Sequence, residues 1–423
     1  MILAPLLLVA CTTPLADLED AHRDLTAALP VFPGAEGFGT DTPAGRGGEV
    51  LRVTTLDDSG PGSLREALST PGPRTVIFDV SGTLWLTEEL LVEEPFLTLA
   101  GQSAPSPGVT LAGAGLVIRT HDVFVQHLRI RPGDREEGPD PEDRDALKII
   151  GGEQGEIDVY GVVVDHCSLS WATDENASTW YPGVRDVTFS HNLIAEGLWY
   201  SRHPEGLHSM GLLVGDHTRR AAVIRNVFAH NNHRNPQSKH DVSLLVANNL
   251  VYDPGDGVVT FSGARFCCPS LASLQGNLRI DGAATQPDLA DVYVARSTHR
   301  DSRVFVEDSG SKWTEVDGVW AAQPPVGVAP LSLVEAAAVE GLLLDAVGAR
   351  PLDRDAVDTR IVAEIRARGG GPLDSQDEVG GWPTLAESTD PLELPEYPSA
   401  DHDGDGYTDL EELLHALAEA VGG

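Results

Sequence analysis

The chain has 423 residues, and its 65 acidic and 29 basic side chains give a formal net charge of −36 at neutral pH. This charge excludes a general nucleic-acid-binding protein, which needs a cationic surface. The 44 glycines and 29 prolines suit a fold of many short strands and turns. We therefore expect an all-β protein without a nucleic-acid partner, and we expect it to be a monomer.

The first residues have the pattern of an export signal. An apolar run ends in the residues LVAC at positions 8–11, which is typical of bacterial lipoprotein signals in which the cysteine becomes lipidated. The run is too short to span a bilayer. We interpret residues 1–30 as a lipoprotein-type signal peptide and linker, with lipidation at Cys11; a plain secretory peptide is the alternative. The protein is expected to be secreted or held at the cell envelope, with the lipid as its only membrane contact.

Residues 31–107 carry strand and turn signals of their own. The segment TVIFDVSGTLWL at 75–86 has the β-branched and aromatic content of strands. The segment SGPGSLREAL at 59–68 instead indicates a turn that leads into a short helix. We expect this helix to cap the first turn of the repeated fold that follows.

From about residue 108 a short phrase of alternating apolar residues, a polar pair and a second apolar group returns along the chain. Such alternation is typical of strands with one buried face, and recurrence at roughly 20–40 residues is typical of a repeat architecture. Asparagines recur at one place of the phrase, where they can bond backbone groups of adjacent coils: Asn192, Asn226, Asn249 and Asn277. Hairpin signals are few, so we predict a right-handed, single-stranded parallel β-helix over residues 31–330. The copies are VFVQHLRI at 123–130, VVVDHCSL at 162–169, VTFSHNLI at 187–194, AVIRNVFA at 222–229, SLLVANNLV at 243–251 and ASLQGNLRI at 272–280.

Two pairs of carboxylates stand beside predicted strands. Asp143 and Asp145 are two residues apart at the entry to a strand, so both can face one cation. Asp174 and Glu175 follow the next coil, and adjacent strands lie about 4.8 Å apart. The sequence therefore predicts a cation site made from four carboxylates on neighbouring coils.

Residues 202–240 invert the charge of the rest of the chain. Only Glu205 and Asp216 are acidic in this stretch, which makes it a candidate surface for an anion. Its basic residues are Arg202, Arg219, Arg220, Arg225, Arg234 and Lys239, and its histidines are His203, His208, His217, His230, His233 and His240.

The spacing of apolar residues changes after residue 330. Segments 331–349 and 353–368 have the apolar spacing of helices, so residues 331–398 are predicted to form a helical and loop extension that packs on the β-helix. Residues 399–423 contain the sequence DHDGDGYTDLEE at 401–412, which has EF-hand spacing with a glycine at the sixth place. We predict a structural calcium site there. Its ligands would be Asp401, Asp403, Asp405, the Tyr407 carbonyl, Asp409 and Glu412.

Several longer motifs resemble those of bacterial pectate lyases of the polysaccharide lyase family 1 type. The resemblance spans nearly the whole chain after the signal. The motifs are FPGAEGFG at 32–39, GRGG at 45–48, DSGPGSLREAL at 58–68, VIFDVSGT at 76–83, VVDHCSLSWATDE at 163–175, EGLWYSRHPEGLHSMG at 196–211, HNNHRNP at 230–236 and DEVGGWP at 377–383.

This resemblance implies calcium-dependent β-elimination of 1,4-linked polygalacturonate, with 4,5-unsaturated products. The family's catalytic base is an arginine in an Arg-x-Pro-x-x-Arg pattern, and Arg234 with the following Asn-Pro matches the first half. Matching positions imply that the four carboxylates hold the active-site calcium: Asp143, Asp145, Asp174 and Glu175. The candidate substrate-binding residues are Lys239, His208, Arg202 and His203.

Two departures from the family pattern keep other functions open. Lys239 stands where the second arginine belongs, and the family's substrate-binding lysine is missing from 203–211. A lyase for another uronic-acid polysaccharide, or an inactive surface protein that binds acidic glycan through calcium, are therefore alternatives. A third alternative is a β-helix glycoside hydrolase, which would need paired carboxylates. The adjacent aspartates Asp57 and Asp58 are its candidate pair.

Overall fold

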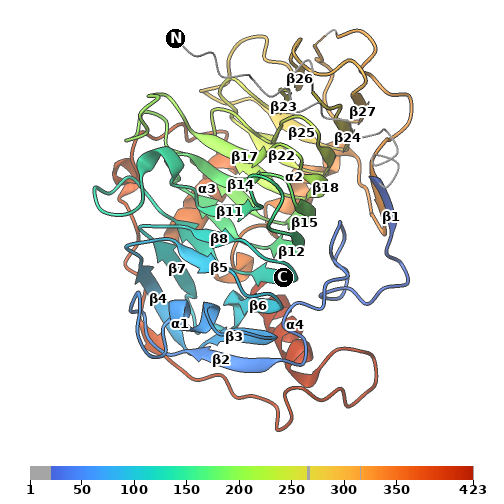
Figure 1. Cartoon of the computed structure of the whole chain (residues 1–423). Coiled ribbons are helices and arrows are strands. Elements are labelled where there is room, and N and C mark those ends of the chain that lie inside the picture. Colours follow the sequence, from blue (N-terminus) through green and yellow to red (C-terminus); the bar gives the residue numbers. More distant parts are fainter. Residues whose placement is uncertain (1–20, 264–266, 315, 423) are drawn as a thin grey trace, which may run out of the picture.

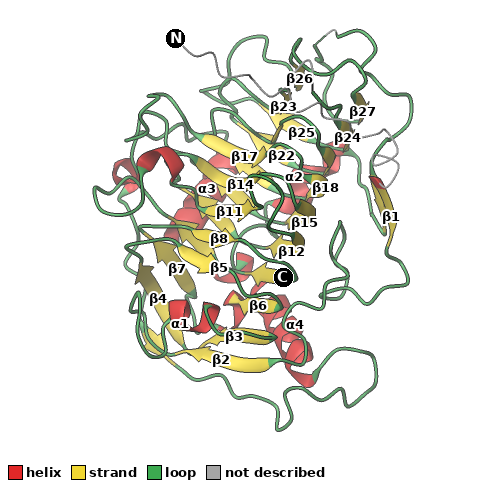
Figure 2. Cartoon of the chain, in the orientation of Figure 1, coloured by secondary structure: helices red, strands yellow, loops and turns green. Residues whose placement is uncertain are grey.

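The computed structural model describes residues 21–263, 267–314 and 316–422. The predicted lipidation site at Cys11 therefore lies outside the described residues. Three long sheets run the length of the molecule, and nearly all of their strands pair in parallel with the equivalent strand of the next coil (Figures 1 and 2). Within the described ranges, no helix has both the length and the apolar character needed to cross a bilayer.

Each complete coil contributes one strand to each sheet. The ten-stranded sheet contains β2 (Glu49–Val53), β3 (Arg74–Phe78), β6 (Leu97–Ala100), β9 (Val123–Gln126), β12 (Val159–Asp165), β15 (Val184–Ser190), β18 (Arg219–Ile224), β21 (Ser243–Ala247), β24 (Leu271–Gln275) and β27 (Arg303–Glu307). The eight-stranded sheet contains β5 (Leu90–Val92), β8 (Leu116–Ile118), β11 (Leu147–Ile150), β14 (Glu175–Trp180), β17 (Met210–Val214), β20 (Gln237–Ser238), β23 (Val259–Phe261) and β26 (Val292–Val294).

The third sheet has nine strands, and one of them comes from the C-terminal part of the chain. It contains β4 (Val80–Trp85), β7 (Val109–Ala112), β10 (Arg129–Arg131), β13 (Ser168–Ser170), β16 (Leu193–Ala195), β19 (Val227–Ala229), β22 (Leu250–Tyr252), β25 (Leu278–Ile280) and the antiparallel edge strand β29 (Ser388–Thr389). A separate parallel pair joins β1 (His22–Asp24) to β28 (Gly327–Ala329), so part of the predicted linker packs on the body of the protein. The predicted parallel β-helix is confirmed.

Like residues stack from coil to coil because the strands are in register. Val162 of β12 aligns with Val123 of β9 and with Val187 of β15, and all three lie fully buried in the interior core. Burying a valine side chain stabilises the fold by about 1.5–3 kcal/mol. Helix α1 (Leu64–Leu68) buries Leu64 and Leu68 in the same core, which places it as the expected cap of the first coil.

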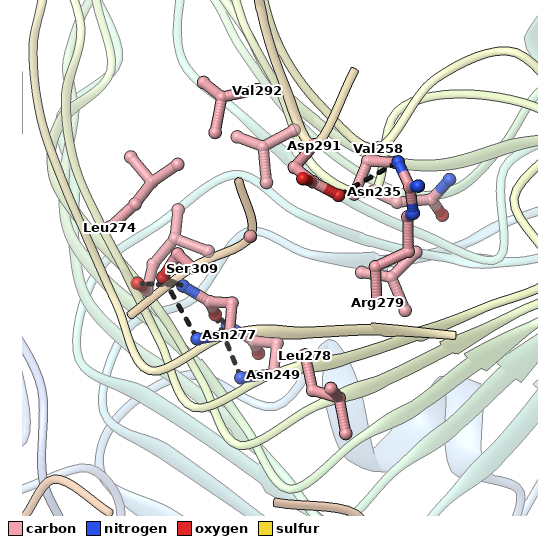
Figure 3. Close-up of a pocket in the computed structure, with 14 residues that line it drawn as sticks. Asn235, Asn249, Val258, Leu274, Asn277, Leu278, Arg279, Asp291, Val292 and Ser309 are labelled. Atoms are coloured by element: carbon pink, nitrogen blue, oxygen red, sulfur yellow. Dashed lines mark hydrogen bonds and ion pairs between the residues drawn. The ribbon is translucent and has the colours of Figure 1, made fainter. Parts of the chain in front are cut away.

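The recurring asparagines form a ladder at the corner between the ten-stranded and nine-stranded sheets. The backbone N–H and the side-chain amide of Asn192 both donate to Asn226 Oδ1 at 2.9 Å. The backbone N–H of Asn226 donates to Asn249 Oδ1 at 2.8 Å, and that of Asn249 donates to Asn277 Oδ1 at 3.0 Å. Figure 3 shows the last rungs, which end at Ser309 beside an internal pocket. The asparagines thus bond adjacent coils, as their recurrence predicted.

The C-terminal part of the chain lies along the outside of the β-helix (Figure 1). Helices α2 (Ala336–Leu343) and α3 (Ala356–Ala367) bury Val339 and Ile361 against the outer face of the nine-stranded sheet, in one cluster with Leu193 and Val227. Helix α4 (Asp409–Gly422) packs near the first coils, against β3 and β6. Short 3₁₀ turns complete this part of the fold: η2 (Gly101–Ser103), η3 (Pro141–Asp143), η4 (Pro351–Asp353) and η5 (Gln376–Val379).

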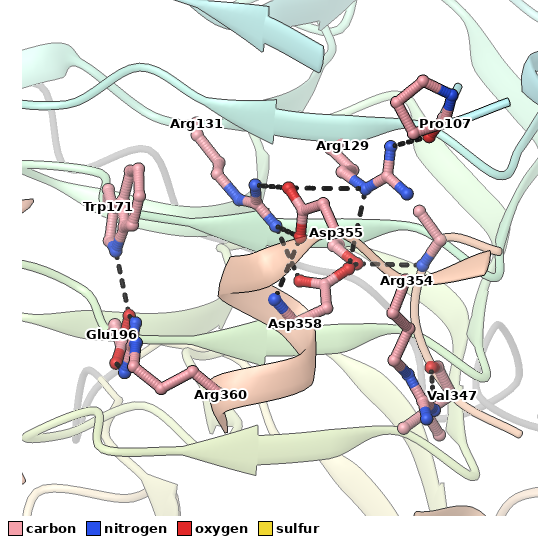
Figure 4. Close-up of polar contacts among 12 residues, drawn as sticks. Pro107, Arg129, Arg131, Trp171, Glu196, Val347, Arg354, Asp355, Asp358 and Arg360 are labelled. Carbon is pink, nitrogen blue, oxygen red and sulfur yellow. Dashed lines mark hydrogen bonds and ion pairs between the residues drawn. The ribbon is translucent and has the colours of Figure 1, made fainter. Parts of the chain in front are cut away.

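A buried ionic network attaches α3 to β10 (Figure 4). Arg131 contacts Asp355 Oδ2 at 2.5 Å and Asp358 Oδ1 at 2.6 Å, and these three side chains are at most 1% exposed. Ser168 Oγ donates to Asp358 Oδ2 at 2.6 Å, and the Asp355 carboxylate also caps the helix by accepting from Asp358 N. The position of α3 therefore depends on charges that are at most 1% exposed to water.

Candidate active site

An open cleft on the outer face of the eight-stranded sheet is lined by residues of β11, β14 and β17. Figure 1 shows these three strands side by side. Leu147 and Ile149 of β11 belong to the interior core, so the alternating residues Lys148 and Ile150 face the cleft. Lys148 is in register with Ser178 of the next coil. The stacked coils thus form a continuous floor for side chains from distant parts of the sequence.

Three aspartates meet in this cleft. Ligand oxygens of Asp143, Asp145 and Asp174 lie within 4.8 Å of one another. Asp145 is buried and accepts a hydrogen bond of 2.5 Å from Ser178 Oγ, whereas the Asp143 side chain is 77% exposed. Burial, followed by the charge of Asp174, raises the pKa of Asp145 well above its ordinary value. Hard oxygen donors that repel one another in this way suit a hard cation such as Ca²⁺.

Arg234 reaches the same cleft from the segment before β20. Its guanidinium pairs with Glu175, at the start of β14. Burial lowers the pKa of Arg234, while the nearby charges of Asp174 and Asp145 act in the opposite direction. Glu175 was predicted to be a cation ligand, but here it holds the guanidinium and does not belong to the aspartate trio.

Two histidines and a lysine complete the polar lining of the cleft. The rings of His203 and His208 stack with centroids 3.7 Å apart, and His208 Nε2 lies 2.7 Å from Asp174 Oδ1. Lys239 Nζ lies 5.7 Å from the ring centroid of Trp180. Burial and then the charge of Arg234 lower the pKa of Lys239. These three predicted substrate-binding residues are therefore in the cleft.

The stretch 202–240 is divided in the structure: four of its cationic or histidine side chains line the cleft and the others lie elsewhere. Those in the cleft are His203, His208, Arg234 and Lys239. The segments of this stretch belong to different sheets, and a coil points successive side chains to different faces. On the ten-stranded side, Arg219 pairs with Asp241 and Arg225 pairs with Glu36. Arg202, predicted to bind substrate, is exposed and does not line the cleft.

Lys148 is a cleft residue that the sequence reasoning missed. Its ammonium lies 2.9 Å from Glu89 Oε1 and 2.9 Å from Asp143 Oδ1, and its side chain is only 5% exposed. The lysine is thus already neutralised by two carboxylates, one of which belongs to the aspartate trio. The alternation of the strand that follows Asp145 was the signal that could have placed it in the site.

Arg144 is a second residue that was missed, and it fixes the loop that carries the trio. This fully buried guanidinium donates to the carbonyls of Gly133 at 3.0 Å, Arg135 at 2.9 Å and Pro139 at 3.0 Å. Its own carbonyl accepts a bond of 3.4 Å from Asp174 N. Arg144 therefore joins the loop before Asp143 to the coil that bears Asp174.

A separate acidic loop lies at the start of α4. Ligand oxygens of Asp401, Asp403 and Asp405 are within 4.8 Å of one another, and all three residues are exposed. Asp409 Oδ2 is instead 2.6 Å from His402 Nδ1. Desolvation, followed by the charges of Asp403 and Asp405, raises the pKa of Glu412. The structure thus gathers part of the predicted EF-hand ligand set.

No protein-family model matches the chain. A curated relative from Aspergillus flavus, described as a probable pectate lyase C, is 32% identical over 407 residues, which cover 92% of this chain and 88% of the relative. The chain belongs to the pectate lyase family. The probable pectate lyase C of Aspergillus fumigatus strain CEA10 is 30% identical over 414 residues, covering 95% of this pectate lyase-family chain and 91% of the relative.

Solved structures agree with this pectate lyase assignment at the level of the fold. A Bacillus pectate lyase solved with trigalacturonate gives a TM-score of 0.52 at 14% identity, covering 74% of this chain and 98% of that one. A Bacillus subtilis pectate lyase gives a TM-score of 0.51 at 13% identity, covering 76% and 98%. The resemblance to pectate lyases is confirmed; because both curated relatives named here are fungal, a bacterial type stays a prediction.

Proposed function

We propose that this protein is an exported, calcium-dependent polysaccharide lyase that cleaves 1,4-linked galacturonan by β-elimination. The observation that carries the proposal is the meeting of Arg234 with the trio Asp143, Asp145 and Asp174 in one open cleft of a pectate lyase-family chain. The Bacillus structure with trigalacturonate supports the substrate class. Export, with lipidation at Cys11, rests on the pattern of the first residues alone.

The aspartate trio fits a calcium ion, because its oxygens converge and a cation would relieve the burial and the repulsion from Asp174 that raise the pKa of Asp145. A bound calcium would neutralise the substrate's C6 carboxylate and stabilise the negative charge that develops when the C5 proton leaves. We assign the trio to this ion. Glu175 is assigned to holding Arg234 in place.

Arg234 is proposed to take the C5 proton. The electron pair of the C5–H bond forms the C4–C5 double bond, the C4–O bond breaks, and the departing oxygen takes a proton from water. The hydroxide that remains takes the proton from Arg234 and restores the base. An arginine normally stays protonated because its pKa exceeds 12. Burial lowers the pKa of Arg234, so the cleft makes the neutral guanidine more accessible. Lys239, His203 and His208 are the groups placed to bind the acidic sugar.

The function is tested by incubating the protein with polygalacturonate and calcium and following the ultraviolet absorbance of unsaturated products. We expect a rise that a chelator abolishes. New reducing ends without absorbance would indicate a hydrolase, and binding without either product would indicate an inactive glycan-binding protein. Because Lys148 is bound by Glu89 and Asp143, it does not replace the family's missing lysine, so other uronic-acid polymers belong in the same assay.

Replacing Arg144 by alanine is expected to weaken calcium binding in the cleft by about 10–100-fold, as is typical when a residue that orients metal ligands is lost. Calorimetric titration of calcium measures this, with added guanidinium ion as a chemical rescue. Arg74→Ala is the matched control, because Arg74 is also fully buried and also donates to several carbonyls, but near α1. Equal loss in both variants would contradict a positioning role for Arg144.

We also propose that the loop before α4 holds a structural calcium ion. A ligand that binds only the folded state at a hundred times its Kd stabilises that state by about 2.7 kcal/mol. Chelation should therefore lower the melting temperature, as measured by calorimetry. The Asp401→Asn, Asp405→Asn double variant should lose the part of this calcium-dependent shift that the loop contributes, whereas Asp143→Asn should lose only the part that the cleft contributes. A full shift in the double variant would show that the loop does not bind calcium.

A further inference from the structure

Asp174 belongs to two clusters that differ in their chemistry. One is the all-oxygen trio with Asp143 and Asp145; the other joins Asp174 to His203 and His208, again with ligand atoms within 4.8 Å. His208 Nε2 lies 2.7 Å from Asp174 Oδ1, and His203 Nε2 lies 3.9 Å from the same oxygen. Both histidines are at most 5% exposed and their rings are nearly parallel, with an interplanar angle of 15°.

We propose that Asp174, His203 and His208 form a binding site for a transition-metal ion such as Zn²⁺ or Co²⁺. Zinc–ligand bonds of about 2.0–2.1 Å in a tetrahedron place the ligand atoms about 3.3 Å apart. The two nitrogen–oxygen distances of 2.7 and 3.9 Å lie on either side of this value. One ring must turn out of the stacked arrangement so that both Nε2 lone pairs face one ion. The fourth position faces the open cleft, where water or a substrate oxygen can bind.

The surroundings of His208 favour a ligand role over a simple hydrogen bond. Its Nδ1 is buried and has no hydrogen-bond partner among the described residues. When Nε2 binds a metal, the proton moves to Nδ1, which points to Glu205 Oε2 at 3.8 Å. Histidine ligands usually donate their second N–H to such a carboxylate, which fixes the ring. A small movement of the Glu205 carboxylate would then give this buried nitrogen an acceptor.

His203 must change one contact to act as the second imidazole ligand. Its Nδ1 accepts a hydrogen bond of 3.2 Å from Glu205 N, and metal binding through Nε2 would place a proton on Nδ1. Glu205 lies in an exposed turn, with its side chain 72% exposed, so its backbone N–H can turn to water while its carboxylate stays beside His208. The cost is one long hydrogen bond at the surface, which is small beside two metal–nitrogen bonds.

The two clusters select different ions. Imidazole nitrogen suits zinc, copper, nickel and cobalt, whereas carboxylate oxygen suits calcium and magnesium. If the trio holds calcium, as the proposed function requires, the two ions compete for Asp174. Another mixed cluster, Asp165 with His166 and His191, is less suited, because Asp165 also accepts bonds from Gln126 and Ser190.

Cobalt titration of the untagged, calcium-free protein tests the site, because tetrahedral Co²⁺ absorbs strongly in the visible range. We expect a saturable band at one Co²⁺ per chain, at least tenfold weaker in affinity in His203→Ala and in His208→Ala. Asp143→Asn is the matched control and should keep the band. A band retained in His208→Ala, a band lost in His166→Ala, or no saturable band would overturn the proposal.

Competition separates this site from the proposed lyase mechanism, since the assay needs no polysaccharide. Added calcium should raise the apparent Kd for Co²⁺ in the unaltered protein but much less in Asp143→Asn. A normal cobalt band that calcium does not displace would support the histidine site and count against calcium at the aspartate trio. A calcium-dependent lyase without any cobalt band would overturn the histidine site alone.

Discussion

Replacing Arg234 by alanine is expected to lower kcat by about 10²–10⁴-fold, the contribution typical of a positioned general base. Arg234 is the cationic group that Glu175 holds beside the aspartate trio. Its loss removes the proposed proton acceptor, while the carboxylates that hold calcium remain. The measurement is the initial rate of ultraviolet absorbance on polygalacturonate at saturating calcium, together with calorimetric titration of calcium.

The calcium titration distinguishes a catalytic role for Arg234 from a structural one. Arg234→Ala should bind calcium at least as well as the unaltered protein, because it removes a positive charge near Asp145 and Asp174. Arg300→Ala is the control for charge, since that side chain is 89% exposed. A kcat within threefold of the unaltered enzyme would exclude Arg234 as the base, and a tenfold loss of calcium affinity would indicate that it shapes the ion site.

Replacing Arg131 by methionine is expected to destabilise the fold by about 3–5 kcal/mol, because it leaves buried carboxylates without their partner. Asp355 and Asp358 are both at most 1% exposed and lie within 2.6 Å of the Arg131 guanidinium. Arg131 is the main charge that holds the pKa of Asp355 down against burial, so its loss leaves Arg129, at 3.7 and 3.8 Å, as the remaining cation beside the two carboxylates. Denaturant unfolding and calorimetry measure the change.

Helix α3 offers a matched control for this prediction. Arg366 pairs with Asp345 at 2.5 Å, but their side chains are 49% and 80% exposed. Arg366→Met should therefore cost less than about 1 kcal/mol. If both variants lost equal stability, burial of the Arg131 network would not be the cause. Replacement of Arg129, Arg131, Asp355 and Asp358 together by apolar residues should recover much of the loss, because no unpaired charge of this network remains.

The sequence predicted the coil architecture because repetition is a local signal. Each apolar phrase contributes a strand with one buried face, and the asparagine at its corner marks the same place in successive coils, as at Asn192 and Asn226. The trio Asp143, Asp145 and Asp174 was also predictable, because two carboxylates share one strand entry and the third follows one coil later. Here spacing in the sequence translates directly into distance in space.

Contacts made by irregular loops could not be predicted in this way. The loop that Arg144 holds has no repeating sequence pattern. The sequence therefore did not predict that Arg144 donates to the carbonyls of Pro139 and Gly133. Glu175 starts β14, and Arg234 lies in the irregular segment before β20. Their pairing depends on the path of that segment, which the sequence spacing of the strands does not predict. Arg131 likewise finds its partners more than two hundred residues later, in a helix whose docking face the sequence leaves open.

The asparagine ladder keeps the spacing of adjacent coils constant, whereas the number of residues between its asparagines varies. Successive rungs are 34, 23 and 28 residues apart in the chain, yet each backbone-to-amide bond is between 2.8 and 3.0 Å long. Extra residues between two ladder asparagines therefore form loops outside the stacked coils and do not shift the strand register. The longest interval, 192–226, contains the excursion that carries His203 and His208 into the cleft. New binding chemistry can thus be gained by lengthening a single coil, without disturbing the neighbouring ones.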